Sequence, residues 1–90
     1  MQDNPTQVPL WRQLQGAASL LMAVREGRSM TAALEGTDAQ LRPGVQSLAF
    51  HTLRWLGRAE ALRQQLARRP PPPEADALLC VALALIWTEH

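Results

Sequence analysis

Catalytic chemistry needs a nucleophile, a base or a set of metal ligands held close together, and this sequence offers few residues of these kinds. Its two histidines, His51 and His90, stand far apart. Neither has a carboxylate or a second histidine four residues away, the spacing that sets two metal ligands on one helix face. The five glycines occur singly, so the chain contains no glycine-rich loop for phosphate. The sequence therefore predicts no catalytic residue, no metal site and no cofactor site in this chain.

Cys80 is the single cysteine and lies inside the apolar run of residues 77–87. A lone cysteine excludes an internal disulfide and a cysteine-based metal cluster, so we expect a small buried apolar side chain in a cytoplasmic protein. The apolar run covers about half of the roughly 20 residues that a helix needs to cross a bilayer. It predicts a core helix rather than a membrane span.

The cationic side chains are all arginines: nine arginines and no lysine face eight carboxylates, for a formal net charge of +1. A guanidinium binds phosphate through two parallel hydrogen bonds and stacks on bases, so arginines can serve RNA recognition. The same composition is equally expected from a genome of high GC content, so the placement of each arginine has to decide. We predict RNA contact for Arg12, Arg54, Arg58 and Arg63, with a solvated surface or an ion pair to Glu60 as the alternative.

Position on the predicted helices favours these four arginines. Arg12 lies in the first turn of a helix, where the helix dipole disfavours a positive charge and a structural role is weak. Arg54 and Arg58 are four residues apart and share a face if their helix continues through Gly57. The pair at residues 68–69 stands at a predicted helix C-terminus, where the dipole favours cations and a structural role is sufficient.

The spacing of apolar residues by threes and fours predicts an all-α chain. Few residues are β-branched and 4% are aromatic, which also favours helices over strands. The expected elements are a disordered tail over residues 1–8 and helices over 9–26, 30–35, 43–56, 58–69 and 74–87, with the four prolines 70–73 as a stiff spacer. The separation of the third and fourth helices at Gly57 is left open. Leu10 and Leu66 are among the side chains predicted to point inward.

The last predicted helix carries large apolar side chains on nearly every side. A helix of this kind is normally buried on all sides, because each large side chain left in water forgoes roughly 1.5–3 kcal/mol. Four preceding helices are too few to cover it. We therefore expect further helices beyond His90, with self-association through residues 77–87 as a possible property of the chain without them.

Three stretches, taken in order, resemble a known family. They are AASLLMAVREGRSMTAAL (17–34), LAFHTLRW (48–55) and ALLCVALALIW (77–87). The pattern is similar to the NusB-like N-terminal domain of the bacterial 16S rRNA cytosine-5 methyltransferases, the RsmB (Sun/Fmu) family, and covers residues 10–90. The family stretch L-C-F/Y-G-V-L-R is matched by Leu48, Phe50, Leu53 and Arg54, whereas His51 stands in place of its glycine.

The resemblance implies a NusB-like all-α bundle over residues 9–90, of which this chain supplies the first five helices, so that the bundle is incomplete at its C-terminus. It also implies a downstream catalytic domain that uses S-adenosylmethionine and a cysteine of its own. The expected partners are 16S rRNA and that catalytic domain, with no DNA and no membrane. The related free-standing NusB proteins bind boxA RNA together with a ribosomal protein, in transcription antitermination.

Two other functions stay open at this point. In the first, the apolar last helix docks to another protein or domain, and RNA never touches this chain. In the second, the chain is an unrelated small helical interaction bundle. Arginines gathered on one face would favour RNA, whereas arginines scattered among carboxylates, or an exposed apolar patch of a few hundred Å², would favour docking.

Overall fold

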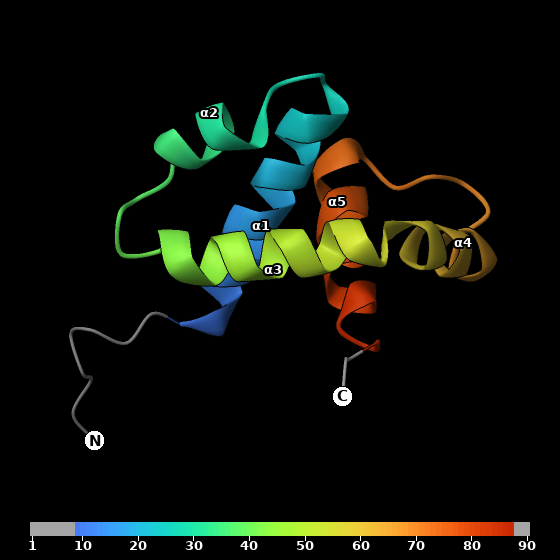
Figure 1. The fold of residues 1–90 in the computed structure, drawn as a ribbon. Coiled ribbons are helices and arrows are strands. Elements are labelled where there is room, and N and C mark those ends of the chain that lie inside the picture. The colour runs from blue at the N-terminus through green and yellow to red at the C-terminus, as the bar shows by residue number, and fades with distance from the viewer. Residues whose placement is uncertain (1–8, 88–90) are drawn as a thin grey trace.

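A computed structural model describes residues 9–87; the predicted tail over residues 1–8 and the last three residues lie outside the described part. Residues 9–87 form an all-α bundle of five helices, which confirms the predicted fold class (Figure 1). The helices are α1 (Leu10–Arg25), α2 (Met30–Glu35), α3 (Arg42–Arg54), α4 (Leu56–Leu66) and α5 (Pro73–Ala84). Helix α1 packs against α2, α3 and α5, and α4 packs against α5, so α1 and α5 carry most of the bundle.

Local signals fix the end of α1 and the start of α2 where the sequence predicts them. Gly27 adopts a left-handed conformation with φ of 92°, which an L side chain rarely tolerates, and Arg28 N–H donates to the Ala23 carbonyl across this turn at 2.9 Å. The Ser29 hydroxyl then accepts a hydrogen bond from the Ala32 amide at 3.0 Å and caps α2. Both predictions are confirmed.

The break between α3 and α4 falls at Trp55, two residues before Gly57. Trp55 has φ of −107° and ψ of 14°, and its amide donates to both His51 and Thr52 carbonyls at 3.2 Å before Ala59 resumes the helical pattern. The Thr52 hydroxyl also donates to the Leu48 carbonyl at 2.7 Å, a side-chain bond of the kind that bends helices. The open question at Gly57 is thus answered: α3 and α4 are two helices, and Gly57 lies inside α4.

Two predicted boundaries near the prolines were wrong. Helix α4 ends at Leu66 rather than residue 69, because Ala67 is already extended with φ of −143° and ψ of 110°. Pro73 is the first residue of α5 rather than part of the spacer. Proline fits this position because the amide N–H that it lacks would have no partner in the first turn of a helix. At the other end, α5 stops at Ala84, and residues 85–87 follow it outside the helix.

The core consists mainly of small side chains. Val45, Val81, Thr52 and Cys80 are the largest side chains that are fully buried. The other residues of the core are mostly alanines from four helices: Ala17, Ala18, Ala23, Ala49, Ala59, Ala77 and Ala84. Alanine lets helix backbones approach closely, so among the leucines and tryptophans only Leu20 and Leu21 are buried in the core, and others pack around it.

Several large apolar side chains that were predicted to point inward are exposed. Leu10 is 58% exposed and Leu66 is 64% exposed. On α1, helices α2 and α3 bury Leu20 against Val45 and Ala49, whereas Leu10 at the first residue of the helix is left uncovered. On α4 the helix ends at Leu66, beyond its contact with α5.

Helix α5 is buried on one side only within this chain. Its small residues face the core, whereas Leu78 and, just after the helix, Leu85 and Ile86 are 38%, 40% and 61% exposed. Helices α1, α3 and α4 therefore cover one side of α5 within residues 9–87. No helix of the described part is long and apolar enough to cross a membrane.

His51 joins α3 to the C-terminal end of α5. Its Nε2 lies 2.7 Å from the Ala84 carbonyl oxygen, one of the last carbonyls of α5, which have no partner inside the helix. This position holds glycine in the family that the sequence resembles. Here an imidazole takes the space between the helices and satisfies a helix end.

The close approach of α1 and α3 gives a first prediction, with a matched control in the same chain. A Cβ on Gly16 would lie 2.5 Å from Cγ2 of the fully buried Val45, whereas a Cβ on Gly57 would meet nothing within 4 Å. We expect Gly16→Ala to lower the free energy of unfolding by about 1–2 kcal/mol. Gly57→Ala should raise it by about 0.5 kcal/mol. Denaturant unfolding followed by circular dichroism measures both; equal effects would mean that the contact at Gly16 is not tight.

Candidate functional site

The four arginines predicted to contact RNA lie in three separate places. Arg12 is exposed in the first turn of α1 and has no ion pair with a described residue. Arg54 and Arg58 come together at the junction of α3 and α4, and both are exposed. Arg63 lies in an ion pair on the inner side of α4, with only 11% of its side chain exposed. The structure thus brings two of the four together.

Arg63 belongs to a cluster of four charged residues that we call the Asp76 cluster: Arg25, Glu60, Arg63 and Asp76. Arg25 donates to Glu60 at 2.7 Å and to Asp76 at 3.0 Å. Arg63 Nε lies 2.8 Å from Asp76 Oδ1, but its N–H is not directed at that oxygen, so this contact is an ion pair without a hydrogen bond. The cluster joins α1, α4 and α5. Arg25 and Arg63, two of the nine arginines, therefore have a structural role.

Cys80 lies beside the Asp76 cluster and is completely buried. Arg25 Nη2 lies 3.7 Å from its Sγ atom. Burial raises the pKa of the Cys80 thiol above its ordinary value, and the hydrogen bond from Arg25 lowers this pKa only in part. Partial burial lowers the pKa of Arg25, but its hydrogen bonds to Glu60, Cys80 and Asp76 outweigh this effect and leave the pKa raised. Cys80 is therefore a protonated, enclosed thiol.

Arg54 and Arg58 lie over the indole of Trp55, and with Trp87 they form what we call the Trp55 cluster. The guanidinium carbons are 5.9 Å and 5.1 Å from the centre of the Trp55 ring, within the range of cation–π attraction. Trp87, which follows α5, stacks on Trp55 with ring centres 6.3 Å apart and an angle of 23° between the planes. The indole N–H of Trp55 is buried without an acceptor among the described residues, so ring contacts hold this side chain in place.

Arg54 and Arg58 lie on either side of the helix break at Trp55. In an unbroken helix they would share a face because they are four residues apart. Here the helix ends at Trp55, and the two side chains converge on the ring of the residue at the break. Residues 42–59 contain Arg42, Arg54 and Arg58 and no Asp or Glu, so the segment itself is basic.

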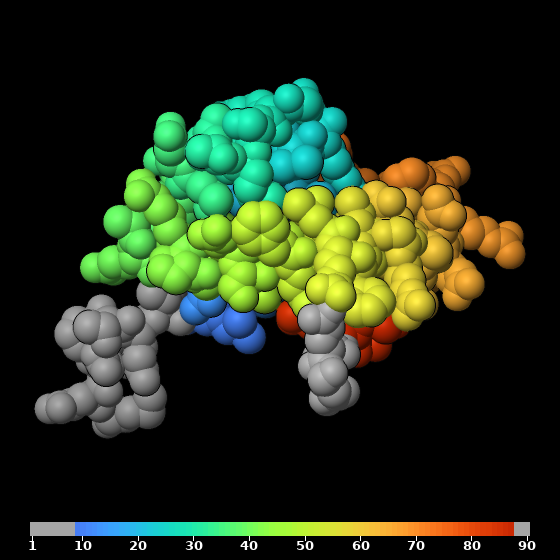
Figure 2. Space-filling model, in the orientation of Figure 1, coloured from blue at the N-terminus to red at the C-terminus, as the bar shows by residue number. Residues whose placement is uncertain are grey.

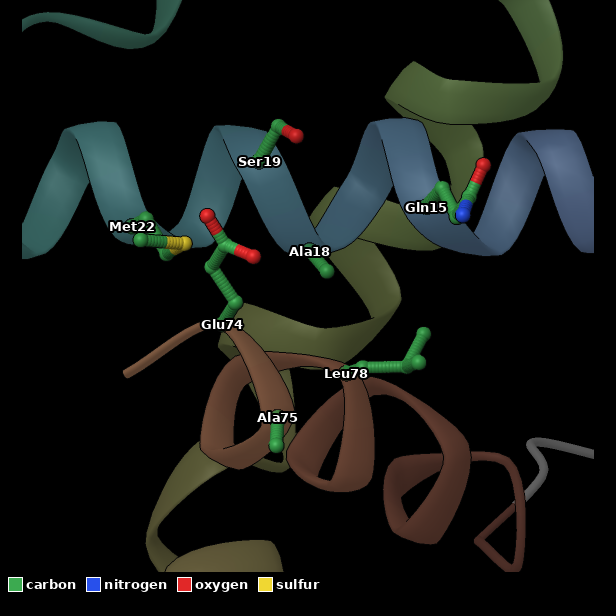
Figure 3. Close-up of a pocket in the computed structure, with 7 residues that line it drawn as sticks. All are labelled: Gln15, Ala18, Ser19, Met22, Glu74, Ala75 and Leu78. Carbon is green, nitrogen blue, oxygen red and sulfur yellow. The ribbon is translucent and has the colours of Figure 1, made fainter. Parts of the chain in front are cut away.

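A second surface is an open groove of about 500 Å³ between α1 and α5. Figure 3 shows Ala18 and Met22 of α1 on one side and Ala75 and Leu78 of α5 on the other, with the Glu74 carboxylate reaching toward α1. Gln15 and Ser19 complete its lining. The groove thus combines four apolar and three polar residues, and the Glu74 carboxylate makes it unsuited to a phosphate.

The start of α1 and the end of α5 emerge on the same side of α3 (Figures 1 and 2). Leu10 and Trp11 at the start of α1 are 58% and 60% exposed, and Leu85 and Ile86 directly follow α5. This end of the bundle therefore adds exposed apolar side chains to those of the groove.

Residues 9–87 contain no group of three or more His, Cys, Asp or Glu side chains that could hold a metal ion. His51 is used in the contact with Ala84, and His90 lies outside the described residues.

Sequence reasoning missed two parts of these surfaces. Trp55 was not singled out from the sequence, yet it is the ring over which two arginines lie. The available signal was an arginine one residue before the tryptophan and another three residues after it. The pairing of Arg63 with Asp76 had no signal, because the two residues are brought together only when α4 packs on α5.

The Asp76 cluster gives a second prediction. Asp76→Asn leaves Arg25 and Arg63 without their shared partner, so we expect the free energy of unfolding to fall by about 2–3 kcal/mol. Glu74→Gln is the matched control, because it also removes a negative charge from the first turn of α5 but breaks no ion pair with a described residue. In Glu74→Gln the free energy of unfolding should fall by less than about 1 kcal/mol. Losses of equal size in thermal unfolding would show that only the helix dipole is involved.

Cys80 gives a third prediction. In the folded chain its thiol should react with a disulfide reagent more slowly, by roughly 100-fold or more, than in denaturant. The pKa of this thiol is higher in the folded chain than in the unfolded chain, so the protonated thiol favours the folded state. Its contribution to the free energy of unfolding is fully present below the ordinary thiol pKa. It is lost as the pH rises through the folded-state value. Fast labelling of the folded chain at mildly alkaline pH would contradict this assignment.

No model of a known protein family matches the chain, and no curated protein or solved structure matches it either. The resemblance to the NusB-like domain therefore depends on the three stretches of sequence alone, and membership of that family stays a prediction.

Proposed function

We propose that this chain is a non-catalytic RNA-binding domain that positions substrate for a 16S rRNA cytosine-5 methyltransferase. The observation that carries the RNA-binding part is the Trp55 cluster, in which Arg54 and Arg58 are held over one indole ring in a segment without carboxylates. Guanidiniums of this kind can grip phosphates and stack on bases.

The arrangement of the cluster supports this proposal in a second way. An arginine that is already restrained by a ring loses less conformational freedom when it binds a phosphate than a freely moving one. By contrast, the Arg63 side chain is only 11% exposed and lies in an ion pair with Asp76, whereas Arg54 and Arg58 are exposed. We therefore assign RNA contact to Arg54 and Arg58, with Arg12 as an outlying contact, and leave Arg63 in its ion pair.

The parent enzyme is proposed from the sequence resemblance. S-adenosylmethionine and the nucleophilic cysteine would belong to its catalytic domain, and no residue of this chain is assigned to either. Cys80 is buried and protonated, so it is unsuited to act as that nucleophile. The contribution of this chain would be to bind rRNA and orient it.

The second candidate function is protein docking, which the groove between α1 and α5 favours. The groove and the end of the bundle expose Leu78, Leu85 and Ile86 together with Trp11, and apolar surface of this kind is typical of interfaces. The two functions are compatible, because the groove and the Trp55 cluster are built from different residues.

The fourth prediction tests RNA binding through its dependence on salt. In the double variant Arg54→Gln, Arg58→Gln, the stems still cover Trp55 but two charges are gone. We expect weaker binding of single-stranded rRNA fragments and a slope of log affinity against log salt that is shallower by roughly 1–2. The control is Arg28→Gln, which removes one exposed charge from the turn between α1 and α2.

Fluorescence anisotropy titrations at several salt concentrations measure these slopes. A double variant with the slope of the unmodified chain would refute RNA binding by the Trp55 cluster. Docking predicts the opposite pattern: the arginine variants change nothing, whereas Leu78→Glu in the groove weakens association of the chain with itself or with the catalytic domain.

A further inference from the structure

Phe50 is one of two aromatic side chains of this chain that are more than half exposed, the other being Trp11. It lies on α3 and is 52% exposed, because Ala49 and Thr52 occupy the buried face of that helix. The other exposed residues of α3 are Arg42, Pro43, Gln46, Ser47 and Arg54. Phe50 is therefore a single large apolar side chain on a polar and cationic helix face, whereas protein interfaces usually present contiguous apolar patches.

The neighbours of Phe50 on this face are the arginines of the Trp55 cluster. Arg54 is four residues further along α3, which places it one helical turn away on the same face. Arg54 and Arg58 then lie over Trp55. We call Phe50, Arg54, Trp55 and Arg58 the Phe50 strip: an exposed ring followed by two guanidiniums, in a segment without carboxylates.

A strip of this composition fits single-stranded RNA better than duplex RNA. In a duplex the bases are stacked on one another, so a protein meets mainly phosphates and 2′-hydroxyls, and an exposed phenyl ring has nothing to stack on. In a single strand an unpaired base can lie on an aromatic ring while the adjacent phosphates reach cations. Both parts are present here within about two helical turns.

We propose that Phe50 stacks on an unpaired base of single-stranded RNA, while Arg54 and Arg58 contact the adjoining phosphates. This inference rests on the proposed RNA-binding function and narrows it to unpaired segments of rRNA. It also assigns a role to a residue that the arginine pattern alone does not select.

The fifth prediction compares two variants of Phe50 on two forms of one RNA. A short single-stranded oligoribonucleotide and the same sequence in a duplex are titrated with the full chain. Phe50→Ala and Phe50→Leu should each weaken single-strand binding about tenfold, since leucine keeps the apolar volume but not the ring, and neither should change duplex binding. Leu66→Ala, which also truncates an exposed apolar side chain, should bind as the unmodified chain does. Circular dichroism checks that each variant is folded.

The outcomes separate this inference from the proposed function. If the unmodified chain binds single strands and both Phe50 variants bind equally well, stacking is refuted and RNA binding by the arginines stands. If the unmodified chain binds neither RNA, both proposals fall. If the Phe50 variants change self-association in sedimentation without changing RNA affinity, the ring serves a protein contact and the inference is overturned.

Discussion

The distance between helix backbones is the constraint on which the rest of this structure depends. Alanines and Gly16 occupy the contacts among α1, α3 and α5, and the largest fully buried side chains are valines, a threonine and a cysteine. Such a core has little room for large side chains, so apart from Leu20 and Leu21 the leucines and all three tryptophans lie around it or in solvent. Each small side chain also removes little apolar surface from water, so the bundle relies on its peripheral contacts.

Ion pairs are among these peripheral contacts, and they change the meaning of the net charge. Arg25 and Arg63 share Asp76, and Arg25 also reaches Glu60, so two carboxylates are neutralised where α1, α4 and α5 meet. Residues 42–59 contain three arginines and no Asp or Glu. A formal charge of +1 for the chain thus hides a basic segment, whereas the folding of α4 onto α5 places Arg63 beside Asp76.

Features with a local cause could be predicted from the sequence. Gly27 and Ser29 act on the backbone next to them, so the end of α1 and the limits of α2 were predicted to within one residue. Features that depend on packing could not be predicted. The burial of Leu20 requires α2 to cover it, and the exposure of Leu66 follows from the early end of α4. The same reason applies to the candidate arginines. The ion pair of Arg63 could not be predicted because its partner is on another helix, whereas Arg58 lies over a ring only three residues away in the sequence.

The Trp55 cluster shows how two side chains can be predicted to lie together for an incomplete reason. Spacing of four residues suggested that Arg54 and Arg58 share a helix face, yet the helix is interrupted between them. They converge because Trp55, at the interruption, lies under both, and because Trp87 from beyond α5 stacks on Trp55. The cluster therefore draws on α3, α4 and the segment after α5, and its geometry depends on tertiary packing. A peptide of residues 42–66 would contain both arginines but would lack Trp87, one of the contacts that hold the indole beneath them.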